Sequence, residues 1–232
     1  MKNSSIRVFD DLSGLVRRDI NPYLLKLEEA REKKMPIVFG PSLKDKKGKW
    51  LDYIRKDKKS PQPSKLIVEI GVHMGQVFCQ LAKDHPNWGF VGLDITFKRV
   101  YSTCEKLVKN KIVNAVSVLA DASYLEEIFS INEIDGVIIF FPDPWDKKRR
   151  QTKNRLINND FCKTMSRLIK PGGFFWMKTD SQNYFLEVSN LIGSISDFKK
   201  SNHSDIGKDY PSIFQTRFQE KNIGFYNCIW VK

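Results

Sequence analysis

The sequence has no apolar run long enough to cross a membrane. A membrane-spanning helix needs about 20 consecutive apolar residues, and the longest run here covers only residues 136–141. The first residues, Met1 to Arg7, also lack the apolar core of a secretory signal. These absences exclude a transmembrane protein and predict a cytoplasmic one.

Cysteine and histidine are too scattered for a metal site. The four cysteines never form a C-x-x-C pair, and the three histidines do not cluster with cysteine or carboxylate at ligand spacing. A zinc ribbon and a redox dithiol are therefore disfavoured, and buried thiols in a reducing compartment are expected. We predict a protein without a metal.

Acidic residues are too few to balance the basic ones. The chain has 39 Lys and Arg but only 27 Asp and Glu, a formal net charge of +12 over 232 residues. Such an excess suits a polyanionic partner, either a nucleic acid or an anionic membrane surface. Against a prior of about 150 residues per domain, the length predicts one large domain or one domain with an appendage.

Residues 1–60 differ from the rest of the chain. They hold many of the lysines and few strand-like runs, and Pro61-Gln62-Pro63 breaks any helix before a strongly patterned segment begins. We predict a basic N-terminal extension over 1–60, partly helical around Pro22–Lys34. Its lysines are either a solvated arm or an arm that follows a phosphate backbone.

Residues 61–232 alternate between strand-like and helix-like patterns. Short apolar runs predict strands at 66–70, 89–93, 115–119, 137–141 and 174–177, with helical spacing between them and after the last. Residues 212–218 and 225–231 are expected to form two antiparallel strands. The fold class predicted is α/β, a doubly wound, mostly parallel, Rossmann-like sheet with antiparallel C-terminal strands.

Every predicted parallel strand ends next to a carboxylate. In doubly wound sheets, ligands bind outside the carboxyl ends of the strands. A negatively charged rim repels pyrophosphate and favours a cationic ligand with a free amine. S-adenosylmethionine is such a ligand. The residues concerned are Glu69, Asp94, Asp121, Asp143 and Asp180.

The first strand ends in a glycine turn that is not a dinucleotide fingerprint. Gly71 and Gly75 let the backbone approach a ligand closely, but His73 stands where G-x-G-x-x-G needs its second glycine. NAD is therefore disfavoured. Asp94, 23 residues after Gly71, is placed to bind ribose hydroxyls. His73 is expected to be a loop side chain rather than a base.

The segment around Asp143 carries the most specific pattern. Pro142 and Pro144 stiffen the backbone on both sides of the carboxylate, and Trp145 follows, with six basic residues within 145–155. Basic side chains for phosphates and an aromatic ring for stacking are how a flipped base is held. A solvated basic loop and a core tryptophan remain the alternatives.

With these motifs the chain resembles the bacterial tRNA (guanine-N7-)-methyltransferase family, which has the class I S-adenosylmethionine-dependent fold. The resemblance covers about residues 64–232, and its most specific part is P-D-P-W-x-K-x-R. The supporting segments are E-I-G-x-x-x-G at 69–75, the acidic ends at 94 and 121, F-P-D-P-W-x-K-x-R at 141–149, K-P-G-G at 170–173, T-D at 179–180 and T-x-F at 216–218.

The resemblance implies a role for each matching residue. Asp143 is expected at the reacting guanine as the catalytic residue. The cofactor side is expected to comprise Glu69, Gly71, Gly75, Asp94, Asp121 and Asp143. The substrate side is expected to comprise Lys147, Arg149, Arg150, Lys153, Arg155, Asp180, Thr216 and Gln219. No metal is implied.

The resemblance also implies an activity, which is methyl transfer from S-adenosylmethionine to N7 of a guanine in the tRNA variable loop. The partner expected is tRNA rather than a membrane, with the protein a monomer or homodimer. Two alternatives stay open: an RNA methyltransferase acting on an exocyclic base amine, and an inactive tRNA-binding homologue.

The chain departs from the family pattern at three places. The family usually has glycine at the position of His73, and the basic stretch from Arg149 to Leu156 is one residue longer than usual. The C-terminal element is commonly T-x-F/Y-E-x-R, whereas Gln219 and Lys221 replace its last two members here. Glu220 beside Gln219 is a candidate substitute for the lost carboxylate, although neighbours on a strand point to opposite faces.

Overall fold

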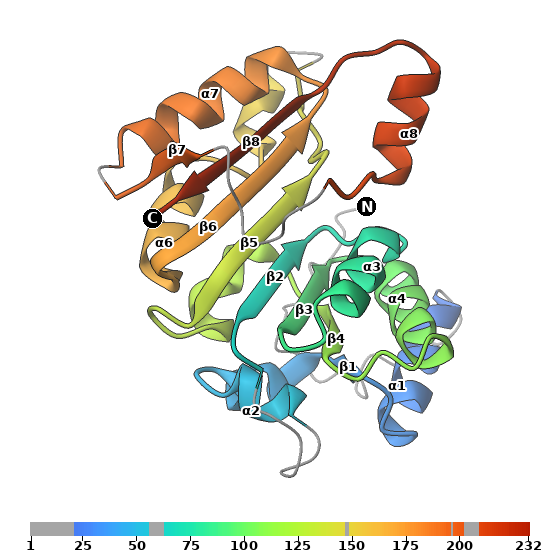
Figure 1. Ribbon diagram of the computed structural model, residues 1–232. Coiled ribbons are helices and arrows are strands. Elements are labelled where there is room, and N and C mark those ends of the chain that lie inside the picture. Colours follow the sequence, from blue (N-terminus) through green and yellow to red (C-terminus); the bar gives the residue numbers. More distant parts are fainter. Residues whose placement is uncertain (1–20, 56–62, 147–148, 196, 202–208) are drawn as a thin grey trace.

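The computed structural model describes residues 21–55, 63–146, 149–195, 197–201 and 209–232. Its centre is an eight-stranded sheet in the order β1-β4-β3-β2-β5-β6-β8-β7 (Figure 1). The strands are β1 (Ile37–Val38), β2 (Leu66–Ile70), β3 (Gly89–Asp94), β4 (Ala115–Leu119), β5 (Ile134–Phe140), β6 (Ile169–Thr179), β7 (Lys199–Ser201) and β8 (Tyr226–Val231).

The strand pairing confirms the predicted fold class. Every neighbouring pair from β1 to β6 is parallel, and β8 runs antiparallel to both β6 and β7. On one side of β2 the order continues with β3 and β4, and on the other side with β5 and β6. The chain therefore reverses its direction of winding between β2 and β5, where open α/β sheets form a ligand crevice.

Helices cover both faces of the sheet (Figure 1). Along β2, Leu66, Val68 and Ile70 face the core that contains α2, α5, α6 and α7, whereas Ile67 faces the core under α3. The helices are α1 (Pro22–Glu32), α2 (Trp50–Ile54), α3 (Gln76–Asp84), α4 (Phe97–Lys109), α5 (Leu125–Ile128), α6 (Asn159–Leu168), α7 (Gln182–Gly193) and α8 (Ile213–Glu220), with 3-10 turns η2 (Gly40–Lys46), η3 (Ala122–Tyr124) and η4 (Arg149–Asn154).

The described part of the N-terminal extension shares this core. Strand β1 pairs with β4, with Ile37 opposite Ser117. Trp50 is fully buried, and its indole Nε1 donates a hydrogen bond to the carbonyl of Ile128 at 2.9 Å. The Glu133 carboxylate accepts hydrogen bonds from the backbone N–H of Trp50 and of Gly48. These contacts fix residues 37–54 on the sheet, while the division of the chain at residue 60 stays a prediction.

The strand expected at residues 212–218 is wrong, because this segment forms helix α8. Ser212 is its N-cap, and the Ser212 hydroxyl accepts a hydrogen bond from the backbone N–H of Gln215 at 3.1 Å. Phe214 and Phe218, four residues apart, both pack against Phe141. A capped start and an i, i+4 aromatic pair are helical features. The antiparallel partners of β8 are instead β6 and the short β7.

We expect Trp50→Ala to lower the free energy of unfolding by about 3–5 kcal/mol, the usual cost of emptying a buried tryptophan site. Urea denaturation followed by circular dichroism measures this change. Leu25→Ala is the control, because Leu25 is exposed on α1 and should change stability by only about 0.5 kcal/mol. Equal small losses in both variants would contradict a core role for the extension.

Candidate active site

A cavity of about 740 Å³ opens at the carboxyl edge of the sheet around the β2–β5 switch point. Four of the five predicted carboxylates line it: Glu69, Asp94, Asp121 and Asp143. The fifth, Asp180, is exposed after β6 and is not among the lining residues. The parallel pairing of the strands thus assembles one acidic rim from residues far apart in the sequence.

Glu69 is a buried carboxylate on the floor of the cavity. Its Oε2 atom has no hydrogen-bond partner among the described residues. Burial, reinforced by nearby Asp94, raises the pKa of Glu69 to about 8. A buried polar atom without a partner is costly. A cationic group placed beside this one would balance the negative charge of the ionised carboxylate and donate a hydrogen bond to its free oxygen.

Asp94 binds the backbone of the glycine turn. Its carboxylate accepts hydrogen bonds from the backbone N–H of His73 at 3.2 Å and of Thr96 at 2.9 Å. The guanidinium of Arg99 lies 3.8 Å from it. Thr96 stands at the N-cap of α4 as expected, but its side chain makes no capping bond. Asp94 therefore holds the loop in shape while still lining the cavity.

The two glycines of the turn serve different needs. Gly71 has φ +82°, and the space where a side chain would project is open. Gly75 has φ +67°, but a Cβ there would lie 2.6 Å from the Thr103 hydroxyl on α4. Gly75 is not among the residues that line the cavity. Gly71 thus leaves room at the ligand side, whereas Gly75 allows the turn to pack on α4.

His73 adopts a backbone conformation that suits glycine. Its φ of +50° lies in the left-handed region, which is uncommon for residues with a side chain. The family's usual glycine would take this conformation without strain. The imidazole instead lines the cavity and packs 5.3 Å from the ring of Phe214. Partial burial and the nearby Arg99 lower the pKa of His73, which favours a neutral ring.

The Asp143 loop is presented in a fixed, exposed conformation. Phe141 and Trp145, on either side of Pro142-Asp143-Pro144, have φ values of +51° and +47°. Asp143 is exposed and forms no ion pair with the described residues. Trp145 lines the cavity and is 39% exposed, so it is not a core residue. A carboxylate and an aromatic ring therefore stand together at the cavity mouth.

Arg155 supports this loop from behind. Its side chain is buried, Nε donates to the carbonyl of Pro144 at 2.7 Å, and Nη1 forms an ion pair with Glu187. The guanidinium also lies over the Tyr184 ring at 4.7 Å. Arg155 was expected to contact RNA phosphate, whereas in this structure its Nε and Nη1 atoms bind Pro144 and Glu187 within the protein. Its position instead supports the backbone beside Asp143.

Of the other predicted basic residues, the structure describes the side chains of two. Arg150 and Lys153 are exposed on η4, beside the Asp143 loop in sequence. Lys147 lies outside the described residues, and so does the side chain of Arg149. Arg150 and Lys153 thus precede in sequence the residues Asn154 and Arg155, which line the cavity.

Helix α8 forms one wall of the cavity through Ser212, Ile213 and Phe214. Thr216 and Gln219 are exposed farther along the helix and are not among the lining residues. Residues three and four apart share a helix face, so the stripe formed by Ser212, Ile213, Thr216, Gln219 and Glu220 continues from the cavity wall. Because this segment is a helix and not a strand, the expectation that Glu220 points to the opposite face is wrong. The sequence signals for helix α8 are the Ser212 N-cap and the i, i+4 pair Phe214 and Phe218, and neither of them indicates a cavity wall.

The donor set fits an organic cation better than a metal. In the described ranges no group of three or more His, Cys, Asp or Glu is placed to hold a metal ion. The cavity combines an unpartnered buried carboxylate with further acidic groups and an open glycine turn. This arrangement suits a ligand with a positive charge and hydroxyl donors, which is the chemistry of S-adenosylmethionine.

Comparison with known proteins agrees with this geometry. Residues 63–225 match the model of a family described as putative methyltransferase. A tRNA (guanine-N(7)-)-methyltransferase from Lacticaseibacillus casei is 32% identical over 174 residues, covering 72% of this chain and 81% of that protein. A bifunctional glycosyltransferase/methyltransferase from Fusobacterium nucleatum is 31% identical over 188 residues, covering 81% of this chain and 28% of that protein.

A solved structure supports the fold alone. The 16S rRNA methyltransferase KamB aligns with a TM-score of 0.52 and 11% identity, over 78% of this chain and 90% of that one. Sheet and cavity together define a class I methyltransferase fold. The chain belongs to the bacterial tRNA (guanine-N7-)-methyltransferase family.

The chain covers only part of the length of some of these relatives. It spans 28% of the length of the Fusobacterium protein and 42% of a relative from Arthrobacter sp.. Among the residues that the structure describes, no helix has the length and apolar character needed to cross a membrane.

We expect the stability of the ligand-free protein to carry the signature of Glu69. Its pKa is about 8 in the folded protein against 4.5 unfolded, so the folded state holds the proton more tightly. Stability from this group is full below pH 4.5 and is lost as pH rises through 8, at up to about 1.4 kcal/mol per pH unit. Glu69→Gln removes this dependence.

Denaturant unfolding at pH 5, 7 and 9 tests this expectation. The variant should gain stability relative to the wild type at each step upward in pH. Glu220→Gln is the matched control, because Glu220 is exposed and its difference from wild type should stay constant. A constant difference for Glu69→Gln as well would contradict a buried, proton-holding carboxylate.

Proposed function

We propose that this methyltransferase transfers a methyl group from S-adenosylmethionine to N7 of a guanine in the variable loop of tRNA. One observation carries the proposal: a single cavity has an acidic, buried floor and an exposed mouth with a carboxylate and an aromatic ring. Its floor holds buried acidic groups on β2 and β3, and its mouth holds exposed Asp143 and Trp145 on a stiff loop. A small cation fits the floor, and a flat base fits the mouth.

The floor provides the residues that would hold the cofactor. We propose Glu69 for its cationic part, Asp94 and Asp121 for its hydroxyl or amine donors, and Gly71 for close backbone approach. Asp121 already accepts a hydrogen bond from the backbone N–H of Ser123 at 2.8 Å, which fixes its carboxylate at the rim. When bound, S-adenosylmethionine supplies an electrophilic methyl group.

The mouth provides the residue that would hold the guanine. The N7 lone pair of guanine lies in the ring plane and carries no proton, so no general base is required. We propose that Asp143 accepts hydrogen bonds from the guanine N1–H and amino groups and offsets the positive charge that develops on the ring. Trp145 would stack on the base. Alignment of the base with the methyl group then supplies much of the rate.

The outer surface supports a tRNA substrate. The net charge of +12 suits a polyanion, and exposed Arg150 and Lys153 lie on η4 after the Asp143 loop. The relative from Lacticaseibacillus casei carries the name of a tRNA guanine-N7 methyltransferase. We assign Asp180 and the α8 residues Thr216 and Gln219 to the substrate side, and a cytoplasmic location follows from a tRNA substrate.

Labelled methyl transfer to unmodified tRNA, followed by chemical cleavage at N7-methylguanine, tests the function. The wild type should yield one cleavage site in the variable loop. Asp143→Asn should lower kcat about a hundredfold, the usual effect of removing one group that stabilises transition-state charge, with cofactor affinity unchanged. Asp146→Asn is the matched control in the same loop. Its side-chain oxygen can still accept the hydrogen bond from the Ser181 hydroxyl, so activity should persist.

Two results would overturn the proposal. Transfer to an exocyclic amine would make the protein a different base methyltransferase. Tight tRNA binding with no transfer and no S-adenosylmethionine binding would make it an inactive homologue. Full turnover by Asp143→Asn with unchanged tRNA affinity would refute the role of its charge alone.

The helical face of α8 allows a separate prediction about the missing carboxylate. Glu220 shares this face with Thr216, so we expect Glu220→Gln to lower kcat/KM for tRNA about tenfold, as for loss of one charge-assisted hydrogen bond. Moving the carboxylate back, in Gln219→Glu combined with Glu220→Gln, should restore activity. Steady-state kinetics on purified tRNA measures both. No effect of Glu220→Gln would leave Glu220 without a role.

A further inference from the structure

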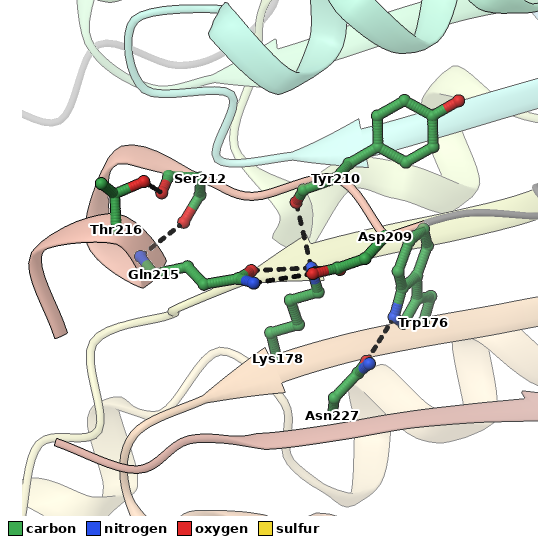
Figure 2. Close-up of polar contacts among 8 residues, drawn as sticks. All are labelled: Trp176, Lys178, Asp209, Tyr210, Ser212, Gln215, Thr216 and Asn227. Atoms are coloured by element: carbon green, nitrogen blue, oxygen red, sulfur yellow. Dashed lines mark hydrogen bonds and ion pairs between the residues drawn. The ribbon is translucent and has the colours of Figure 1, made fainter. Parts of the chain in front are cut away.

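Lys178 is a lysine buried at the carboxyl end of β6, outside the lining of the cavity. Its side chain is fully buried, whereas lysine is almost never fully buried unless it is paired. Its ammonium donates to the carbonyl of Tyr210 at 3.0 Å and to Gln215 Oε1 at 2.9 Å, and it forms an ion pair with Asp209 (Figure 2). Each of its three N–H groups therefore has an acceptor.

All three acceptors lie within residues 209–215, which comprise the segment that leads into helix α8 and its first turn. Gln215 is the one residue of α8 that is buried, and its amide also donates to Asp209 Oδ2 at 2.7 Å. Figure 2 shows Lys178 reaching from the strand toward this segment. We call these four residues, Lys178, Asp209, Tyr210 and Gln215, the lysine lock.

Aromatic rings complete the surroundings of the ammonium. Phe140 and Trp176 lie with their ring centroids 4.6 Å and 5.1 Å from Lys178 Nζ, which are favourable cation–π distances. Burial lowers the pKa of Lys178, and the ion pair with Asp209 acts against this shift. Although burial acts to raise it, the hydrogen bonds from Lys178 and Gln215 hold the pKa of Asp209 below its usual range.

Helix α8 has few other attachments. Phe214 and Phe218 pack on Phe141, and Phe214 also lies 5.3 Å from the His73 ring. Most of the remaining α8 side chains are exposed or half-buried. In Figure 1 the helix stands beyond the tip of β5, apart from the helices that cover the faces of the sheet. The lysine lock thus joins the cavity wall at Ser212–Phe214 to the strand beside the Asp143 loop.

We propose that Lys178 is a positioning residue that holds helix α8 in place as the wall of the active site facing the RNA. The proposal rests on the proposed function for the identity of that substrate. The cofactor-side carboxylates Glu69, Asp94 and Asp121 lie on or just after β2, β3 and β4, whereas the polar contacts of Lys178 join β6 to residues 209–215. Loss of the lock should therefore weaken use of the RNA while leaving use of the cofactor intact.

Two variants break the lock and one control spares it. Lys178→Met keeps the length of the buried chain but removes the charge, and Gln215→Met removes one acceptor from the α8 side alone. Lys170→Met is the control: Lys170 lies at the start of β6 and forms its ion pair with Asp135 at 2.8 Å. All three lose a polar contact of one strand, so a general loss of stability would affect them alike.

Limited trypsin digestion, read by mass spectrometry, reports docking of α8 without any reaction. Arg217 and Lys221 are exposed in and just after the helix, and cleavage after them requires local opening of α8. Both lock variants should be cut there about tenfold faster than wild type, in line with the cost of leaving buried partners unpaired. Lys170→Met should be cut at the wild-type rate.

Kinetics with S-adenosylmethionine and tRNA then separate positioning from general damage. In both lock variants, KM for tRNA should rise about tenfold while kcat and KM for the cofactor change less than about threefold. Unchanged cleavage and unchanged KM for tRNA would overturn the proposal, as would an equal effect of Lys170→Met. If wild type methylates no tRNA, the proposed function fails, whereas the digestion still decides whether the lock holds α8.

Discussion

The site follows from the parallel pairing of β2 with both β3 and β5. Because the chain winds away from β2 in two directions, the helices that follow β2 and β5 leave by opposite faces, and a crevice opens between the two strand ends. Glu69 stands at one side of that crevice and the Asp143 loop at the other. Neither group alone would form a site, and the register of the sheet brings them together.

Two opposite electrostatic environments meet at this crevice. The floor is acidic and includes a buried carboxylate whose ionisation is costly without a cation, whereas the chain as a whole carries an excess of 12 positive charges. A small cation is therefore favoured inside, and a polyanion is favoured outside. Arg155 does not follow this division. It belongs to the basic run in sequence, but it forms an ion pair with Glu187 inside the protein.

The sequence predicted the parts of the fold whose signals are local. Apolar runs located β2 to β6, and the carboxylates after them gave most of the cavity rim. Helix α8 was missed because Ile213, Phe214 and Phe218 also suit a strand, and its docking depends on Gln215 meeting Lys178 from β6. Strands β1 and β7 are two and three residues long, too short for a periodic pattern. The role of Arg155 depends on contacts with Pro144 and Glu187, distant along the chain.

The walls of the cavity are held by different kinds of contact, and this difference bears on how they move. His73, Phe141 and Trp145 all have left-handed backbone conformations, each costing about 1–3 kcal/mol. Such conformations persist only where neighbours fix them, as Asp94 does for His73 and Arg155 does for the Asp143 loop. These two loops are therefore preorganised. Helix α8 has one buried side chain, Gln215, and that side chain binds Lys178, so the position of this wall depends on a polar anchor rather than on backbone conformation.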